Sequence, residues 1–349
     1  MIKKAASAFA LTILGLLFGL VIVEIFFRLF YSSSKPGSAW SDRPLFYYKA
    51  EAADSIQDYA YPRKKPENAF RIAVVGDSYS FAPYMQFTDT FPKRLEQILN
   101  LNTGSMRGEV INYGVPAFST MHEVAAVDKA VRRDADLVML QITLNDAELK
   151  PYRPKGINAD MVDPFGSFKV AESSPAIYRY WKTLAFIAER LHNSRSHREY
   201  REYFPSLFNT DQNWREYTKS IKKIKRSCEG KSVPLVAVVF PLFGLPLDDT
   251  YPFHELHKKI EDHLAEEGIP FLDLFEIYRG IPLERLQVIP GADRHPNEIA
   301  HRMAAERIYL WLVERELIPT DLRARQLFNE RLGITGRGAI GIGEIKTPR

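Results

Sequence analysis

The sequence RIAVVGDSYSFA, residues 71–82, contains a run of branched apolar residues that stops abruptly at a glycine. Such a run, bounded by turn residues, is typical of a strand buried on both faces of a parallel sheet. Asp77 and Ser78 follow directly, at the carboxyl end of this predicted strand. Parallel sheets bind their ligands at that edge. Ser78 is therefore a candidate nucleophile, phosphate ligand or helix cap.

Four further apolar runs resemble the first one. They cover residues 109–114, 136–143, 234–241 and 269–274. Amphipathic stretches alternate with them, over residues 91–101, 122–133, 214–230 and 253–268, and a last helix is predicted from Pro296 to Leu317. Strands that alternate with helices predict a parallel sheet with helices on both faces. The fold class is therefore α/β, a three-layer α/β/α sandwich around a central five-stranded parallel sheet.

The N-terminus predicts a membrane anchor. Ala5 to Val23 carry no charge, and at ~1.5 Å per residue these nineteen residues reach about 28 Å, close to the thickness of the bilayer hydrocarbon. Lys3 and Lys4 keep the N-terminus cytoplasmic. We expect a single pass through the inner membrane, with the rest of the chain periplasmic or extracellular. A cleaved signal peptide is the alternative.

Five segments follow from this pattern. Residues 1–31 form the anchor, 32–68 a linker and lead-in, and 69–317 the α/β domain; residues 318–349 form a polar tail. Residues 150–212 interrupt the alternation and predict a helical insertion over the carboxyl edge of the sheet, or extra helices that serve only packing.

Composition excludes several classes of function. The net charge is only +4 and no long Lys/Arg run occurs, so we expect no nucleic-acid partner. Cys228 is the sole cysteine, which excludes an intramolecular disulfide and a cysteine metal cluster. His254 and His257 stand three residues apart on a predicted helix, but no third ligand is evident, so we interpret them as surface histidines. We expect no metal and no organic cofactor.

Several polar residues follow the predicted strands and meet at one edge of the sheet. A serine hydroxyl needs a neighbouring base, which His295 can supply, while Asp293 orients the imidazole. The oxyanion of a tetrahedral intermediate needs hydrogen-bond donors, and the candidates are the backbone N–H groups of Ser78 and Gly114 and the side-chain amide of Asn145. This set predicts acyl transfer. Ser80 is the rival nucleophile, but it is turned by about 200° on a helix and cannot face the same site.

These residues resemble the SGNH (GDSL-like) hydrolase superfamily, in its membrane-anchored bacterial type. The resemblance rests on Gly76-Asp77-Ser78, on Gly114 in Asn-Tyr-Gly-Val-Pro-Ala, on Asn145-Asp146 and on His295-Pro296-Asn297, in the family's order, within residues 69–317. It implies a flavodoxin-like fold, with Ser78 as nucleophile, His295 as base, and Gly114 and Asn145 completing the oxyanion hole.

Two positions depart from the family pattern. Thr143 stands where the third block has glycine, and the aspartate is Asp293, two residues before the histidine, whereas the family places it three before, at Ala292. The Asp-x-His spacing resembles that of polysaccharide O-acetyltransferase relatives.

The resemblance implies a serine-dependent esterase or O-acyltransferase that acts, through an acyl-enzyme on Ser78, on an acetyl or other ester of a cell-envelope saccharide or lipid. The alternatives are a catalytically inactive envelope glycan-binding module of the same fold, and a phosphate or nucleotide binder with its anion at residues 76–80. The sequence leaves the oligomeric state open.

Overall fold

A parallel sheet of five strands forms the centre of the domain. The computed structural model describes residues 2–31, 58–101, 105–150, 152, 175–290 and 293–323. The strands are β1 (Ala69–Val75), β2 (Arg107–Asn112), β3 (Leu137–Ile142), β4 (Leu235–Val239) and β5 (Phe271–Asp273), in the order β2-β1-β3-β4-β5. All pairings are parallel. Every residue of β3 and β4 is buried, as expected for strands covered on both faces.

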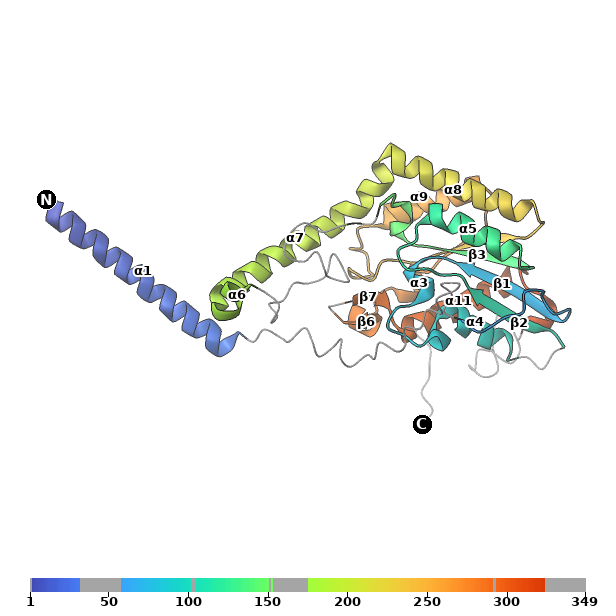
Figure 1. Cartoon of the computed structure of the whole chain (residues 1–349), viewed down its shortest axis with the longest axis horizontal. Helices are drawn as coiled ribbons and strands as arrows, with labels where there is room; N and C mark the ends of the chain where they lie inside the picture. Colours follow the sequence, from blue (N-terminus) through green and yellow to red (C-terminus); the bar gives the residue numbers. More distant parts are fainter. Residues whose placement is uncertain are drawn as a thin grey trace.

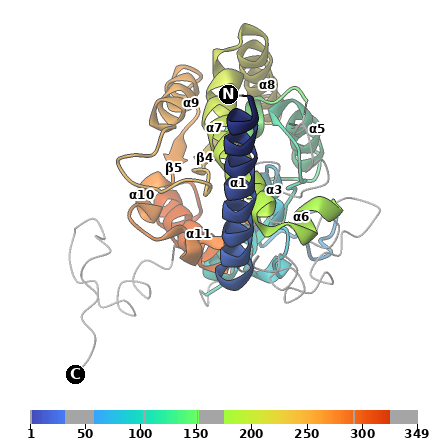
Figure 2. The same ribbon diagram turned by 90° about the vertical axis from the view of Figure 1, so that its left-hand side faces the viewer.

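Helices cover both faces of the sheet, so the predicted three-layer sandwich is confirmed. Helices α5 (Thr120–Val131), α8 (Asp211–Glu229) and α9 (His254–Glu266) lie on one face, and α4 (Phe91–Leu99) and α11 (Glu298–Glu314) on the other (Figures 1 and 2). The remaining elements are α1 (Ile2–Phe30), α3 (Ser78–Phe81), η2 (Phe87–Asp89), η3 (Leu144–Ala147), α6 (Ala176–Tyr180), α7 (Lys182–Asn209), α10 (Phe275–Tyr278), η4 (Leu283–Arg285), β6 (Gln287–Ile289), β7 (Asp293–Pro296) and η5 (Thr320–Leu322).

Helix α1 fits the predicted anchor in length and composition. Its segment Ala8–Phe30 has a mean hydropathy of 2.6 over its most apolar window, and none of that window is buried in the protein. Within the described part of the chain it is the one helix long and apolar enough to cross a membrane, as an anchor or as a signal sequence. Arg28 and Glu24 form an ion pair near its carboxyl end, at 2.9 Å.

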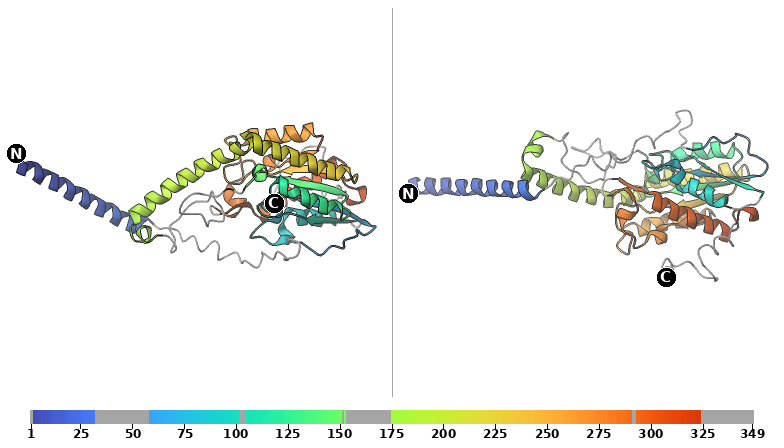
Figure 3. Two further views of the ribbon diagram at one scale, coloured as in Figure 1. Left: turned by 45° about the horizontal axis from the view of Figure 1, so that its top comes forward. Right: turned by 90° about the horizontal axis from the view of Figure 1, so that it is seen from below.

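Helix α7 accounts for most of the described insertion. It is a single helix of 28 residues that runs from the end of α1 to the domain (Figure 3). Its first half contacts α1, and its second half packs on η3 and α8, with Tyr200, Phe204 and Phe208 buried in the core. The predicted linker at residues 32–57, the first part of the insertion at 153–174 and the tail beyond residue 323 lie outside the described residues.

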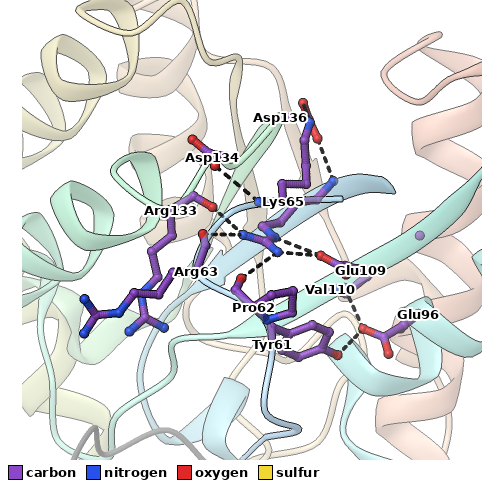
Figure 4. Close-up of polar contacts among 12 residues, drawn as sticks. Tyr61, Pro62, Arg63, Lys65, Glu96, Glu109, Val110, Arg133, Asp134 and Asp136 are labelled. Atoms are coloured by element: carbon purple, nitrogen blue, oxygen red, sulfur yellow. Dashed lines mark hydrogen bonds and ion pairs between the residues drawn. The ribbon is translucent and has the colours of Figure 1, made fainter. Parts of the chain in front are cut away.

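The buried Arg71 joins the lead-in segment to the first strand pair. Figure 4 labels several of its partners, including Pro62 and Glu109. The Arg71 Nε and Nη2 atoms lie 2.9 and 2.8 Å from Glu109 Oε2 on the neighbouring strand, and both side chains are almost fully buried. The guanidinium also donates to the carbonyl oxygens of Pro62, Arg63 and Arg133, at 3.1, 3.3 and 2.6 Å. The charge is thus paired and its donors are used, as a buried charge requires.

Two acidic side chains extend this network. Asp136 Oδ2 accepts the Arg71 backbone N–H at 2.7 Å, and its other oxygen contacts Lys65. Glu96 accepts from the Tyr61 hydroxyl at 2.5 Å. The segment before β1 is therefore held against the amino ends of the strands, which leaves their carboxyl ends free for a site.

We predict that Arg71→Met lowers the free energy of unfolding by about 3–5 kcal/mol, because it leaves Glu109 buried without its partner. The double variant Arg71→Met/Glu109→Leu should recover part of that loss. Urea titration of the chain in detergent micelles measures both. A loss below about 1 kcal/mol, the size expected of an exposed ion pair, would contradict this role.

Candidate active site

The turn after β1 presents Ser78 at the start of helix α3. Gly76 is required there, since a Cβ atom would lie 2.2 Å from Gln141 Oε1 and 2.7 Å from Ser80 Oγ. Asp77 caps the helix, because its Oδ1 accepts the Tyr79 N–H at 2.8 Å. Ser78 is consequently the first helical residue and is only half-buried.

A Ser-His-Asp arrangement is formed as the sequence predicts. His295 Nε2 lies 2.9 Å from Ser78 Oγ, and His295 Nδ1 lies 2.7 Å from Asp293 Oδ1. The same Asp293 oxygen accepts the backbone N–H of His295 at 2.9 Å, which fixes the strand around the pair. Asp293 is fully buried, whereas His295 is partly exposed. The geometry is that of a nucleophile, a base and a group that orients the base.

The base and its partner lie on a short hairpin that the sequence analysis did not predict. Strand β7 has four residues and pairs antiparallel with β6, which has three. Asp293 and His295 stand two residues apart on β7 and therefore lie on the same face of it. Runs this short carry too little periodicity to be recognised.

Ser80, the rival candidate, points into the protein. Its side chain is fully buried, and its Oγ lies 2.8 Å from Gln141 Oε1. Of the two serines, Ser78 is the one beside His295.

Asp77 links the nucleophile turn to the end of β3. Its Oδ2 accepts the Asn145 Nδ2–H and the Thr143 hydroxyl, each at 2.9 Å. Thr143, which departs from the glycine of the family pattern, thus contributes a hydrogen bond. An amide nitrogen carries two hydrogens, so the second one of Asn145 can serve a substrate oxygen. Ser78 N–H, in the first turn of α3, has no acceptor among the described residues.

The structure does not support Gly114 as an oxyanion donor. Its N–H already donates to Asn112 Oδ1 at 3.0 Å, and the residue is buried. Gly114 instead makes room for α3, because a Cβ there would lie 2.6 Å from both Phe81 N and Ser80 Cβ. The Gly114 N–H, which we expected to serve a substrate oxygen, therefore already has an acceptor within the protein.

Ala117 is a candidate donor that the sequence analysis missed. It is exposed, its φ of 63° lies in the left-handed region, and its N–H has no acceptor among the described residues. The loop that carries it is held beside the nucleophile turn, since Val115 N–H donates to the Gly76 carbonyl at 3.1 Å. A non-glycine residue in this conformation is uncommon, and such residues gather at functional sites. Alanine at that position gives no signal in the sequence.

Two buried acids lie beneath the nucleophile turn and were not predicted. Burial, and the neighbouring charge of Asp77, raise the pKa of Glu123 well above its usual range. Burial, followed by the charges of Glu123 and Asp77, raises the pKa of Asp146 in the same way. Within the described chain neither carboxylate oxygen of Glu123 has a hydrogen-bond partner, nor do Gln141 Nε2 and Tyr217 Oη, which are buried as well. Groups of this kind are satisfied by internal water in most proteins.

The interpretation of His257 as a surface histidine is wrong. This residue is buried rather than on the surface, and its Nδ1 lies 2.6 Å from Asp273 Oδ2, whereas His254 is exposed. Among the described residues, no three acidic, histidine or cysteine side chains lie close enough together to hold a metal ion.

We predict that Glu123 makes the protein less stable as the pH rises. Its pKa in the folded state lies above the ordinary value of 4.5, so the folded state binds its proton more tightly than the unfolded chain does. The stabilising contribution is full below pH ~4.5 and is lost as the pH rises toward the folded-state pKa. Glu123→Gln should therefore show a smaller fall in Tm between pH 5 and pH 8.5 than the wild type. Parallel Tm curves would contradict this account.

Comparisons with known proteins give structural likenesses at low identity. No protein-family model and no curated protein sequence matches this chain. A catalytic mutant of an acetylxylan esterase from Geobacillus stearothermophilus is 12% identical, with a TM-score of 0.44, over 73% of this chain and 97% of that one. The acetyl xylan esterase AlAXEase is 12% identical, with a TM-score of 0.43, over 70% and 100%. The lipase/acylhydrolase from Enterococcus faecalis is 14% identical, with a TM-score of 0.40, over 70% and 96%.

Proposed function

We propose that this protein is a serine-dependent esterase or O-acyltransferase. It forms an acyl-enzyme on Ser78 and acts on an acetyl or other ester of a cell-envelope saccharide or lipid outside the cytoplasm. The observation that carries the proposal is the continuous chain of contacts from Ser78 Oγ to His295 at 2.9 Å and from His295 to Asp293 at 2.7 Å. An inactive glycan-binding module would have no need of this alignment.

The first half of the reaction transfers the acyl group to the enzyme. Ser78 Oγ attacks the ester carbonyl carbon while its proton moves to His295 Nε2. Asp293 stabilises the imidazolium that forms. When the tetrahedral intermediate collapses, the bond to the alcohol oxygen breaks, and that oxygen takes the proton from His295. An alcohol leaves, and the acyl group remains on Ser78.

The second half regenerates Ser78. Water, or a hydroxyl of an acceptor, attacks the acyl-enzyme and gives its proton to His295, which returns it to Ser78 Oγ. Water yields a carboxylic acid and makes the protein an esterase, whereas a saccharide hydroxyl yields a new ester and makes it an acyltransferase.

The developing negative charge needs donors that are already in place. The Ser78 N–H and the second Asn145 hydrogen are two such donors, and Ala117 N–H is the candidate for the third. The hydrogen bond from Asn145 to Asp77 holds the amide in position before the substrate arrives.

Two features of the sequence support the proposed location and acyl group. The basic residues before α1 favour a cytoplasmic N-terminus, so the catalytic domain lies on the periplasmic or outer side of the membrane. Asp293 stands two residues before His295, a spacing that resembles polysaccharide O-acetyltransferases. Acetyl is therefore the acyl group that we favour.

The experiment that tests this function is acetate release from 4-nitrophenyl acetate by the full-length chain in detergent. We predict that Ser78→Ala lowers kcat/KM by about 10³-fold or more. Ser80→Ala is the matched control in the same turn and should keep most of the activity. Equal rates for the wild type and Ser78→Ala would contradict an acyl-enzyme on Ser78 and would favour a binding module.

A further inference from the structure

Helix α7 begins beside α1, the helix that we propose as the membrane anchor. The Glu24 carboxylate accepts the backbone N–H groups of Lys182 and Thr183, at 3.0 and 2.9 Å, and the Thr183 hydroxyl at 2.8 Å. The first N–H groups of a helix have no partner within the helix and favour a negative charge. Glu24 therefore caps α7 from another helix.

Further contacts fix the direction in which α7 leaves α1. The rings of Phe27 and Phe186 lie 4.6 Å apart, and the Tyr31 hydroxyl contacts Glu189. Positions 24, 27 and 31 of α1 thus meet positions 183, 186 and 189 of α7 in the same order. The first turns of α7 run beside the last turns of α1 and away from the membrane interior.

The side chains at this junction suit a bilayer surface. Large apolar residues are exposed on α6 and the first turns of α7, namely Ile177, Tyr180, Trp181, Ile187 and Leu191. Arg179, Lys182 and Arg190 lie among them. Tyrosine and tryptophan gather at membrane–water interfaces, and basic side chains are attracted to anionic headgroups. Since the proposed membrane anchor α1 lies beside this patch, the bilayer is its fitting partner.

The second half of α7 contacts the β6–β7 hairpin. The guanidinium of Arg294, the residue between Asp293 and His295, lies over the Tyr200 ring at 4.6 Å from its centre. Gly244 packs against the same pair, because a Cβ there would lie 2.3 Å from Tyr200 Oη and 3.0 Å from Arg294 Cδ. The helix that begins beside α1 therefore contacts, through Tyr200 in its second half, the residue between Asp293 and His295.

The length of α7 limits how far the site can stand from the bilayer. Tyr200 follows Thr183 by seventeen residues, which span ~26 Å at 1.5 Å per residue. Any tilt of α7 shortens that height. The carboxyl edge of the sheet, where α3 and β7 lie, also faces the end of the molecule that carries α1 (Figures 1 and 3).

We propose that the substrate is an ester carried by a lipid of the bilayer in which α1 is anchored. Helix α7 sets the reach of the site, so that Ser78 acts on esters presented within about 26 Å of the membrane surface. This inference rests on the proposed function, since it names the substrate class of the same site.

The test uses the full-length protein in vesicles of phosphatidylethanolamine and phosphatidylglycerol. The probe is an umbelliferyl acetate joined to phosphatidylethanolamine through two, eight or fourteen prolines, which span ~6, 25 and 43 Å at about 3.1 Å per proline. The same umbelliferyl acetate without lipid measures the intrinsic activity. We expect the fastest hydrolysis with eight prolines or fewer, and a rate at least tenfold lower with fourteen.

A variant with a longer α7 provides the matched comparison. Seven alanine-rich residues inserted after Leu191 add ~10 Å and turn the helix by only about 20° from its original face. The best spacer should then lengthen by up to three prolines, while hydrolysis of the free probe stays unchanged. Should the insertion disturb folding, the wild-type spacer series still decides the question.

The outcomes separate the two proposals. Hydrolysis of the free probe together with no hydrolysis of any lipid-borne probe, or a maximum at fourteen prolines, would overturn the inference and leave the proposed function standing. If the wild type hydrolyses none of the probes faster than Ser78→Ala does, the proposed function itself is contradicted.

Discussion

The site depends on the buried carboxyl group of Asp77. One of its oxygens caps α3 and thereby places Ser78 at the first helical position, and the other holds the side chains of Thr143 and Asn145. A single side chain thus joins the carboxyl ends of β1 and β3, which are neighbours in the sheet. The proposed nucleophile and a proposed oxyanion donor are thus positioned by the same group. Such preorganisation is what transition-state stabilisation requires.

The surroundings of Asp77 satisfy the oxygens of this buried carboxyl group. Three hydrogen bonds to Tyr79, Thr143 and Asn145 stabilise its oxygens. Burial, and after it the neighbouring charges, raises the pKa values of Glu123 and Asp146 and favours their neutral forms.

Much of the fold could be predicted because buried parallel strands are continuous apolar runs, as in residues 71–75. The contact between Asp293 and His295 was also predictable, since the two residues lie in a short motif whose proposed chemistry needs both side chains. The backbone donors of the oxyanion hole are harder to predict, because every residue except proline has an N–H group. Gly114 was chosen by residue type and serves packing, whereas Ala117 carries no sequence signal. The length of α7 escaped prediction because its role lies in contacts with α1, far away in the sequence.

The most direct test of the central claim is covalent trapping of the nucleophile. A fluorophosphonate forms a stable adduct only with a serine that a neighbouring base activates. After reaction with the full-length chain, peptide mass spectrometry should find the phosphonyl group on Ser78 and none on Ser80, and His295→Ala should abolish the adduct. Labelling of another serine, or equal labelling of the His295→Ala variant, would contradict the assignment of Ser78, His295 and Asp293 as one catalytic unit.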